Sequence, residues 1–162
     1  MILDKFMKQT LYEQDYQLWI DKTIEQLKQR EFVDLDFEHL IEELIDLGKS
    51  EKKSLESNLM ILLAHLLKLK VQAEAPDTMK NSWYNSVDEH RKRVLIDLKE
   101  TPSLKNYLTI AIEKAYQNGR DLAIKEGKRG KYGVQISEES NYPIVCPFLI
   151  EQILYEDFYF TT

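Results

Sequence analysis

The sequence has one cysteine, Cys146, and few helix-breaking residues: five Gly and four Pro in 162 positions. A lone cysteine excludes an intramolecular disulfide and a metal site built from several cysteines, and it fits a reducing, cytoplasmic location. The scarcity of Gly and Pro, together with many Leu, Glu and Lys residues, favours helices. The length and the 43% hydrophobic content predict a single domain over residues 1–162 with a core of its own.

Several functional signatures are absent. No apolar run approaches the roughly 18 residues that a membrane span requires, and the first residues, MILDKFMKQT, lack the continuous apolar segment of a signal peptide. The net charge of −6 disfavours membrane surfaces and nucleic acids as partners, because both attract a positive field. The chain contains no P-loop, nucleophile elbow or His-Glu-x-x-His pattern. We therefore predict no membrane association and no cofactor.

The segment from Leu35 to Lys70 carries the longest helical pattern of the chain. Its apolar stripe recurs at steps of three and four and runs through Phe37, Ile41, Leu44, Gly48, Lys52, Leu55, Leu59, Leu62, Leu66 and Leu69. The phase survives Gly48 and Lys52, which favours one long helix over two helices joined at Gly48. We expect this stripe to face inward along its whole length. Asp34 or Asp36 can cap the start of the helix.

Similar patterns predict the remaining helices. The expected ranges are Thr10 to Arg30, Met79 to Glu100, Thr101 to Gly127, and Phe148 to about Tyr155. Thr10 and Glu13 have capping-box spacing, and the small residues Ala111, Ala115 and Gly119 would allow a neighbouring helix to approach closely. The sequence therefore predicts an all-α fold: a bundle of four main helices plus a short C-terminal helix, organised around a long helix at about 35–70.

A set of short motifs in a fixed order resembles a known family. The motifs are Tyr12-x-x-Asp15-Tyr16-x-x-Trp19, Leu35-Asp36-x-Glu38-x-x-Ile41-Glu42-Glu43-Leu44, Leu47-Gly48-x-Ser50-Glu51, His65-Leu66-Leu67-Lys68, Ser82-Trp83, Arg91, Pro102-Ser103-Leu104, Ala115-Tyr116 and Cys146-Pro147. Over about residues 11–154 the chain resembles the domain of unknown function 29 family of small bacterial proteins. Gly119-Arg120 stands where the family usually has Ala-Arg. The resemblance implies an all-helical fold and supplies no established activity.

The acidic stretch over residues 34–46 contains no Lys or Arg and is open to three interpretations. It is a solvated helix face whose first acids complement the helix dipole, or a buried ion pair in which Glu42 or Glu43 meets Arg91 or Arg120. Alternatively, it is a site for a divalent metal, because carboxylates and imidazole suit Mn, Fe or Zn. The candidate metal ligands are Glu38, His39, Glu42 and Glu43.

The candidate catalytic residues are Glu42, Glu43, His65 and Arg91. His65 lies in a leucine-rich stretch, where a histidine is more often a hydrogen-bonded core residue than a base or a ligand. In a continuous helix, the 23 residues between Glu42 and His65 separate them by roughly 35 Å. Arg91 falls on the apolar stripe of its helix, so we expect it to be partly buried and paired.

These features support three functional hypotheses. The favoured one is a non-enzymatic protein-interaction or oligomerisation module, because catalytic motifs are absent and the chain is rich in helical apolar faces. The first alternative is a metal-dependent hydrolase centred on Glu42 and Glu43, with Arg91 holding an anion. The second is a regulatory nucleic-acid binder that uses the basic loop at residues 127–131.

Overall fold

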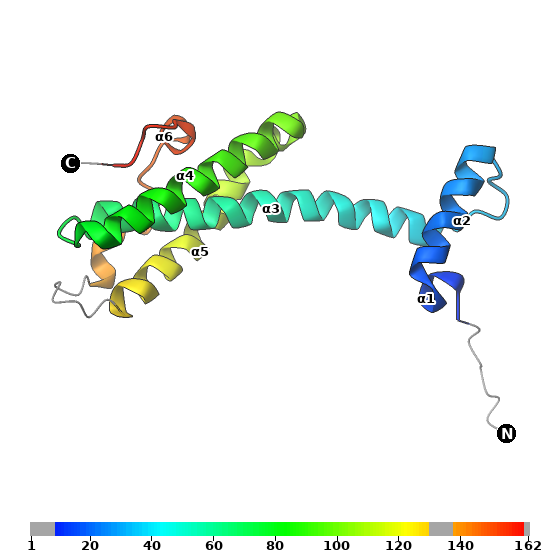
Figure 1. Cartoon of the computed structure of the whole chain (residues 1–162), viewed down its shortest axis with the longest axis horizontal. Coiled ribbons are helices and arrows are strands. Elements are labelled where there is room, and N and C mark those ends of the chain that lie inside the picture. Colours follow the sequence, from blue (N-terminus) through cyan, green and yellow to red (C-terminus); the bar gives the residue numbers. More distant parts are fainter. Residues whose placement is uncertain (1–8, 130–137, 161–162) are drawn as a thin grey trace, which may run out of the picture. The chain divides into compact units, whose positions relative to one another are not determined.

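The computed structural model describes residues 9–129 and 138–160, and Figure 1 shows the helices they form. The α-helices are α1 (Leu11–Gln14), α2 (Tyr16–Gln29), α3 (Phe37–Val71), α4 (Asp77–Glu100), α5 (Leu108–Arg129) and α6 (Ile150–Leu154). Two 3₁₀ helices, η1 (Pro102–Tyr107) and η2 (Glu139–Asn141), complete the set, and these two ranges contain no strand. The predicted all-α fold with four long helices and a short C-terminal one is confirmed.

The chain divides into two compact units, Met1–Gly48 and Lys49–Thr162. We call them the N-terminal unit and the C-terminal unit. The expectation of one domain over the whole chain stays a prediction. Within the described ranges, no helix combines the length and apolar character needed to cross a membrane.

Helix α3 is unbroken from Phe37 to Val71, which confirms continuity through Gly48. The predicted burial of its stripe is correct only in the C-terminal half, where the leucines from Leu55 onward are buried. In the N-terminal half the prediction is wrong, because Phe37, Ile41 and Leu44 are all more than half exposed. Periodicity identifies an apolar face, but neighbouring helices decide whether that face is covered.

The C-terminal unit supplies those neighbours. Helices α4 and α5 lie beside the second half of α3 (Figure 1), and the apolar stripe of α4, with Trp83, Val87 and Val94, is buried as predicted. Helix α5 packs closely against α3 at Gly119, where an added Cβ would lie 2.7 Å from the carbonyl oxygen of Met60. The predicted role of this small residue is therefore confirmed.

Some helix boundaries differ from those predicted. The first helix is interrupted at Asp15, whose side chain accepts a hydrogen bond from the backbone N–H of Leu18 and so caps α2, while Thr10 forms the expected capping box with Glu13. Helix α5 continues past Gly127 to Arg129, so Gly127 does not end it. The basic loop predicted at residues 127–131 is helical as far as Arg129, and residues 130 and 131 lie outside the described ranges.

The N-terminal unit has very little core. Among its described residues only Trp19, Thr23 and Leu35 are buried. A unit of fewer than 50 residues is near the lower limit for independent stability, because it buries too small a fraction of its apolar surface. This unit therefore depends strongly on the few contacts that join α1 and α2 to α3.

Candidate functional site

Glu43 joins α1 and α2 to α3. One carboxylate oxygen accepts a hydrogen bond of 2.6 Å from the Tyr12 hydroxyl, and the other accepts one of 2.7 Å from the Tyr16 hydroxyl. These two bonds lower the pKa of Glu43, and the same interaction raises the pKa of Tyr12 to about 12. Glu43 is therefore a carboxylate that stays ionised and is held in place by two phenols, rather than a proton donor.

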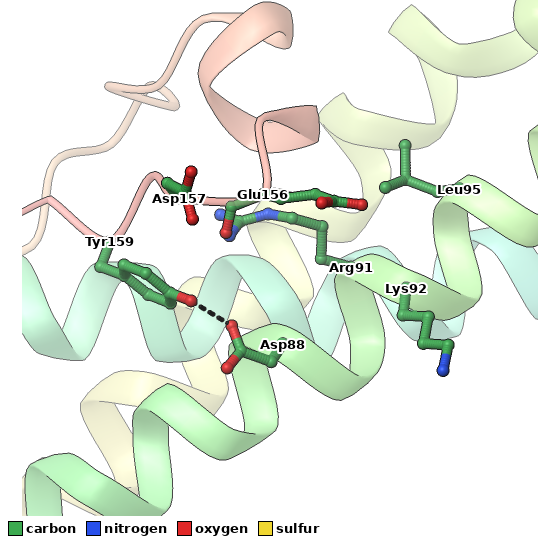
Figure 2. A pocket seen from close by; sticks show the side chains of 7 residues that line it. All are labelled: Asp88, Arg91, Lys92, Leu95, Glu156, Asp157 and Tyr159. Atoms are coloured by element: carbon green, nitrogen blue, oxygen red, sulfur yellow. Dashed lines mark hydrogen bonds between the residues drawn. The ribbon is translucent and has the colours of Figure 1, made fainter.

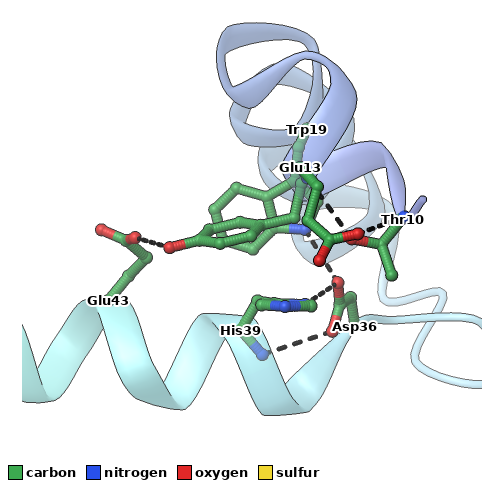
Figure 3. Close-up of polar contacts among 7 residues, drawn as sticks. Thr10, Glu13, Trp19, Asp36, His39 and Glu43 are labelled. Atoms are coloured by element: carbon green, nitrogen blue, oxygen red, sulfur yellow. Dashed lines mark hydrogen bonds and ion pairs between the residues drawn. The ribbon is translucent and has the colours of Figure 1, made fainter.

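Asp36 forms another polar contact in the N-terminal unit, with Trp19 and His39 (Figure 3). Its Oδ2 accepts from Trp19 Nε1 at 3.1 Å and lies 2.7 Å from His39 Nδ1, while its Oδ1 accepts from the backbone N–H of His39 and so caps α3. Burial alone would raise the pKa of Asp36, but the hydrogen bonds from His39 and Trp19 lower it. The bond to Asp36 raises the pKa of His39, so the two side chains form an ion pair at mildly acidic pH.

The candidate metal ligands do not converge. Glu38 and Glu42 are exposed, Glu43 is bonded to two tyrosines, and His39 directs Nδ1 at Asp36. In the part of the chain that the structure describes, no group of three or more His, Cys, Asp or Glu side chains could hold a metal ion. The solvated-face interpretation therefore fits Glu38 and Glu42, whereas Glu43 is part of a hydrogen-bonded contact that none of the three interpretations included.

Both candidate arginines of the expected ion pair bond to backbone carbonyls, and their pairing with Glu42 or Glu43 stays a prediction. Arg91 donates from Nε to Ile153, from Nη1 to Glu156 and from Nη2 to Phe158, over 2.9, 2.9 and 2.5 Å. Arg120 donates to the carbonyl oxygens of residues 139, 142 and 143. The two arginines anchor the C-terminal segment.

A hollow of about 350 Å³ adjoins Arg91 (Figure 2). Its lining is charged and mixed in sign: Asp88, Arg91, Lys92, Glu156 and Asp157, together with Leu95 and Tyr159. Asp88 accepts a hydrogen bond from the Tyr159 hydroxyl at 2.5 Å, and each of the three Arg91 donor groups is occupied by a carbonyl. Three of the five N–H groups of the guanidinium thus donate to backbone carbonyls, and these bonds hold it in place.

His65 is a structural residue of α3. Its Nδ1 lies 2.9 Å from the carbonyl oxygen of Ile61 and 3.2 Å from the Ser86 hydroxyl. Nδ1 must carry a hydrogen to donate to the carbonyl, and burial lowers the pKa of His65, so the ring is neutral at physiological pH. His65 belongs to the C-terminal unit and Glu42 to the N-terminal unit.

The most distinctive surface is an apolar groove of about 260 Å³ between α2 and α3 in the N-terminal unit. We call it the N-terminal groove; its lining consists of Tyr16, Trp19, Ile20, Thr23, Ile24 and Leu27 from α2 and Leu40, Glu43, Leu44 and Leu47 from α3. Four of its aliphatic side chains are between 41% and 61% exposed: Ile24, Leu27, Leu44 and Leu47. Phe37, Ile41 and Ile45, elsewhere on α3, are also more than half exposed.

One groove residue, Leu44, lies in an environment that differs from the predicted one. It belongs to the stripe expected to face inward, yet it is 60% exposed. A single layer of two helices cannot cover both apolar faces. The order of the helices is a signal for this exposure. Apart from α2, the other long helices all follow Val71, so the acidic half of α3 has few helical neighbours along the chain.

Comparison with known proteins gives a family and no close relative of known structure. The family model described as Domain of unknown function DUF29 matches residues 11–159. The chain therefore belongs to this family, as its ordered motifs indicated. No curated protein and no solved structure matches it.

Proposed function

We propose that this chain is a protein-interaction module that binds a partner through the N-terminal groove. The observation that carries the proposal is the exposure of Ile24, Leu27, Leu44 and Leu47 along one apolar groove. Large contiguous apolar patches are uncommon on monomeric soluble proteins and commonly mark interaction sites. This supports the interaction hypothesis over the metal-dependent hydrolase, because no group of three or more His, Cys, Asp or Glu side chains in the described ranges could hold a metal ion.

The poor core of the N-terminal unit supports the same function. Helices α2 and α3 bury Trp19 but leave leucine and isoleucine side chains exposed to water. Covering one fully exposed side chain of this kind stabilises a protein by about 1.5–3 kcal/mol. A partner that covered several of them would therefore stabilise the unit as well as bind to it.

Site-specific photo-crosslinking tests the proposal. A photoreactive residue replaces Leu44 in the full chain, which is expressed in its native cells, and Ile110 serves as the matched control because it is 49% exposed on α5 of the C-terminal unit. We expect a discrete crosslinked product from position 44 and none of the same mass from position 110. The partner is either another protein or a second copy of the chain, and both fit an interaction module. Absence of a product at position 44, or an equal product at both positions, would contradict the proposal.

A further inference from the structure

The negative charge of the chain is concentrated in the N-terminal unit. Residues 1–48 contain 12 Asp and Glu against five Lys and Arg, a formal charge of −7, whereas residues 49–162 contain 16 acidic and 17 basic residues, a formal charge of +1. Together these give the −6 of the whole chain. The apolar groove and the excess acid thus occur in the same short unit.

Acidic side chains border the apolar surface of α3. Glu38 and Glu42 are exposed and lie three residues before Ile41 and Ile45, so they neighbour these exposed isoleucines and not Leu40 and Leu44 of the groove. Glu43 lines the groove itself, and its bonds to Tyr12 and Tyr16 hold its carboxylate in place. A helix that settles in the groove therefore meets apolar side chains and the fixed carboxylate of Glu43, in a unit whose formal charge is −7.

We infer that the occupant of the N-terminal groove is an amphipathic helix of another protein whose polar face carries Lys or Arg. The inference rests on the proposed function and specifies the partner's chemistry. A second copy of the chain would bring its own groove with the same formal charge of −7, so the two acidic units would repel each other. Helix-in-groove binding uses apolar anchors at i, i+3, i+4 and i+7, and the α2 lining from Tyr16 to Leu27 matches about three helical turns.

Binding of a defined peptide to the full chain tests this inference. The probe is a fluorescein-labelled helix of about 14 residues, roughly four turns, in which Leu occupies one face and Lys the rest. One comparator has Glu in place of every Lys, and another has the Leu and Lys residues scrambled so that no apolar face forms. The protein variants are Leu44→Glu and the control Ile110→Glu, which add the same charge to exposed positions in different units.

We expect the Lys peptide to bind the unaltered chain and Ile110→Glu with equal affinity. This affinity should fall as the salt concentration rises from about 50 mM to about 500 mM. Leu44→Glu should weaken binding at least about tenfold, the effect of losing one buried leucine contact, although it makes the unit more acidic. The Glu and scrambled peptides should bind at least about tenfold more weakly than the Lys peptide. Circular dichroism confirms that both variants keep their helices.

Three results would overturn the inference. Equal binding of the Lys and Glu peptides, or no binding of either, shows that charge does not select the occupant. Equal binding by the unaltered chain and Leu44→Glu shows that attraction to the acids suffices without the groove. A dimer of the unaltered chain in sedimentation, converted to a monomer by Leu44→Glu, makes a second copy the occupant. If the crosslink at position 44 forms while the Lys peptide fails, the proposed function stands and only the partner chemistry is wrong.

Discussion

Arg91 is predicted to be the side chain on which the C-terminal segment most depends. It is only 1% exposed, and its three donor groups bind the carbonyl oxygens of Ile153, Glu156 and Phe158. Replacing it by methionine keeps most of the apolar stem and removes all three bonds. Hydrogen bonds from a charged donor contribute about 1.5–3 kcal/mol each. Two of the three bonds are only part-buried, so water partly replaces the lost donors. We therefore expect Arg91→Met to lower the free energy of unfolding by about 3–5 kcal/mol.

Arg93 provides the matched control, two residues along the same helix. Its side chain is 59% exposed and forms an i,i+4 ion pair with Glu89 at 2.7 Å, an interaction that is worth at most about 0.5 kcal/mol. Urea unfolding followed by tryptophan fluorescence measures both variants, and limited chymotrypsin digestion reports release of the aromatic segment around Phe158. At about 2–4 °C per kcal/mol for a chain of this size, Arg91→Met should melt at least about 6 °C lower than Arg93→Met.

The conservative variant Arg91→Lys separates charge from geometry. Lysine keeps the positive charge but has one ammonium group instead of a planar fork, so it cannot reproduce three separate bonds to three carbonyls. We expect Arg91→Lys to recover less than half of the loss. If Arg91→Met and Arg93→Met unfold within about 0.5 kcal/mol of each other, the anchoring role of Arg91 is refuted.

Further predictions concern two glycines and one ion pair. Gly119→Ala should destabilise the chain by about 1–3 kcal/mol, because its Cβ would meet a backbone carbonyl of α3 at 2.7 Å. Gly48→Ala should instead stabilise α3 by up to about 1 kcal/mol, because nothing lies within 4 Å of its Cβ. Thermal melts in which both substitutions shift the melting temperature in the same direction would contradict this contrast. The ion pair between Asp36 and His39 should be strongest at pH values that lie between the lowered pKa of Asp36 and the raised pKa of His39. It is lost as pH rises through the pKa of His39, because the imidazole loses its charge, and as pH falls through the pKa of Asp36. Titration of His39 by NMR should give a pKa above the ordinary histidine value of about 6.5. The substitution Asp36→Asn should return the pKa of His39 towards that value. If the substitution leaves this pKa unchanged, the ion pair is rejected.

Local sequence patterns were sufficient to predict the helices themselves. The spacing of Thr10 and Glu13 predicted a capping box, and the unbroken phase through Gly48 predicted one long helix; both depend on residues close in the chain, and both are present. The family assignment follows from the order of short motifs, which the match over residues 11–159 confirms.

Tertiary structure decided which faces of these helices are covered and which polar groups meet. The same α3 stripe is buried at Leu55 and exposed at Leu44, because burial depends on neighbouring helices that periodicity does not identify. The bond from Tyr12 to Glu43 spans 31 residues, and the bond from Arg91 to Phe158 spans 67. One sequence contains no signal for such long-range pairs, since side-chain hydrogen bonds depend on the final positions of both groups. The sequence thus determined the helices and their apolar faces, and only the folded structure revealed that one of those faces remains open as a groove.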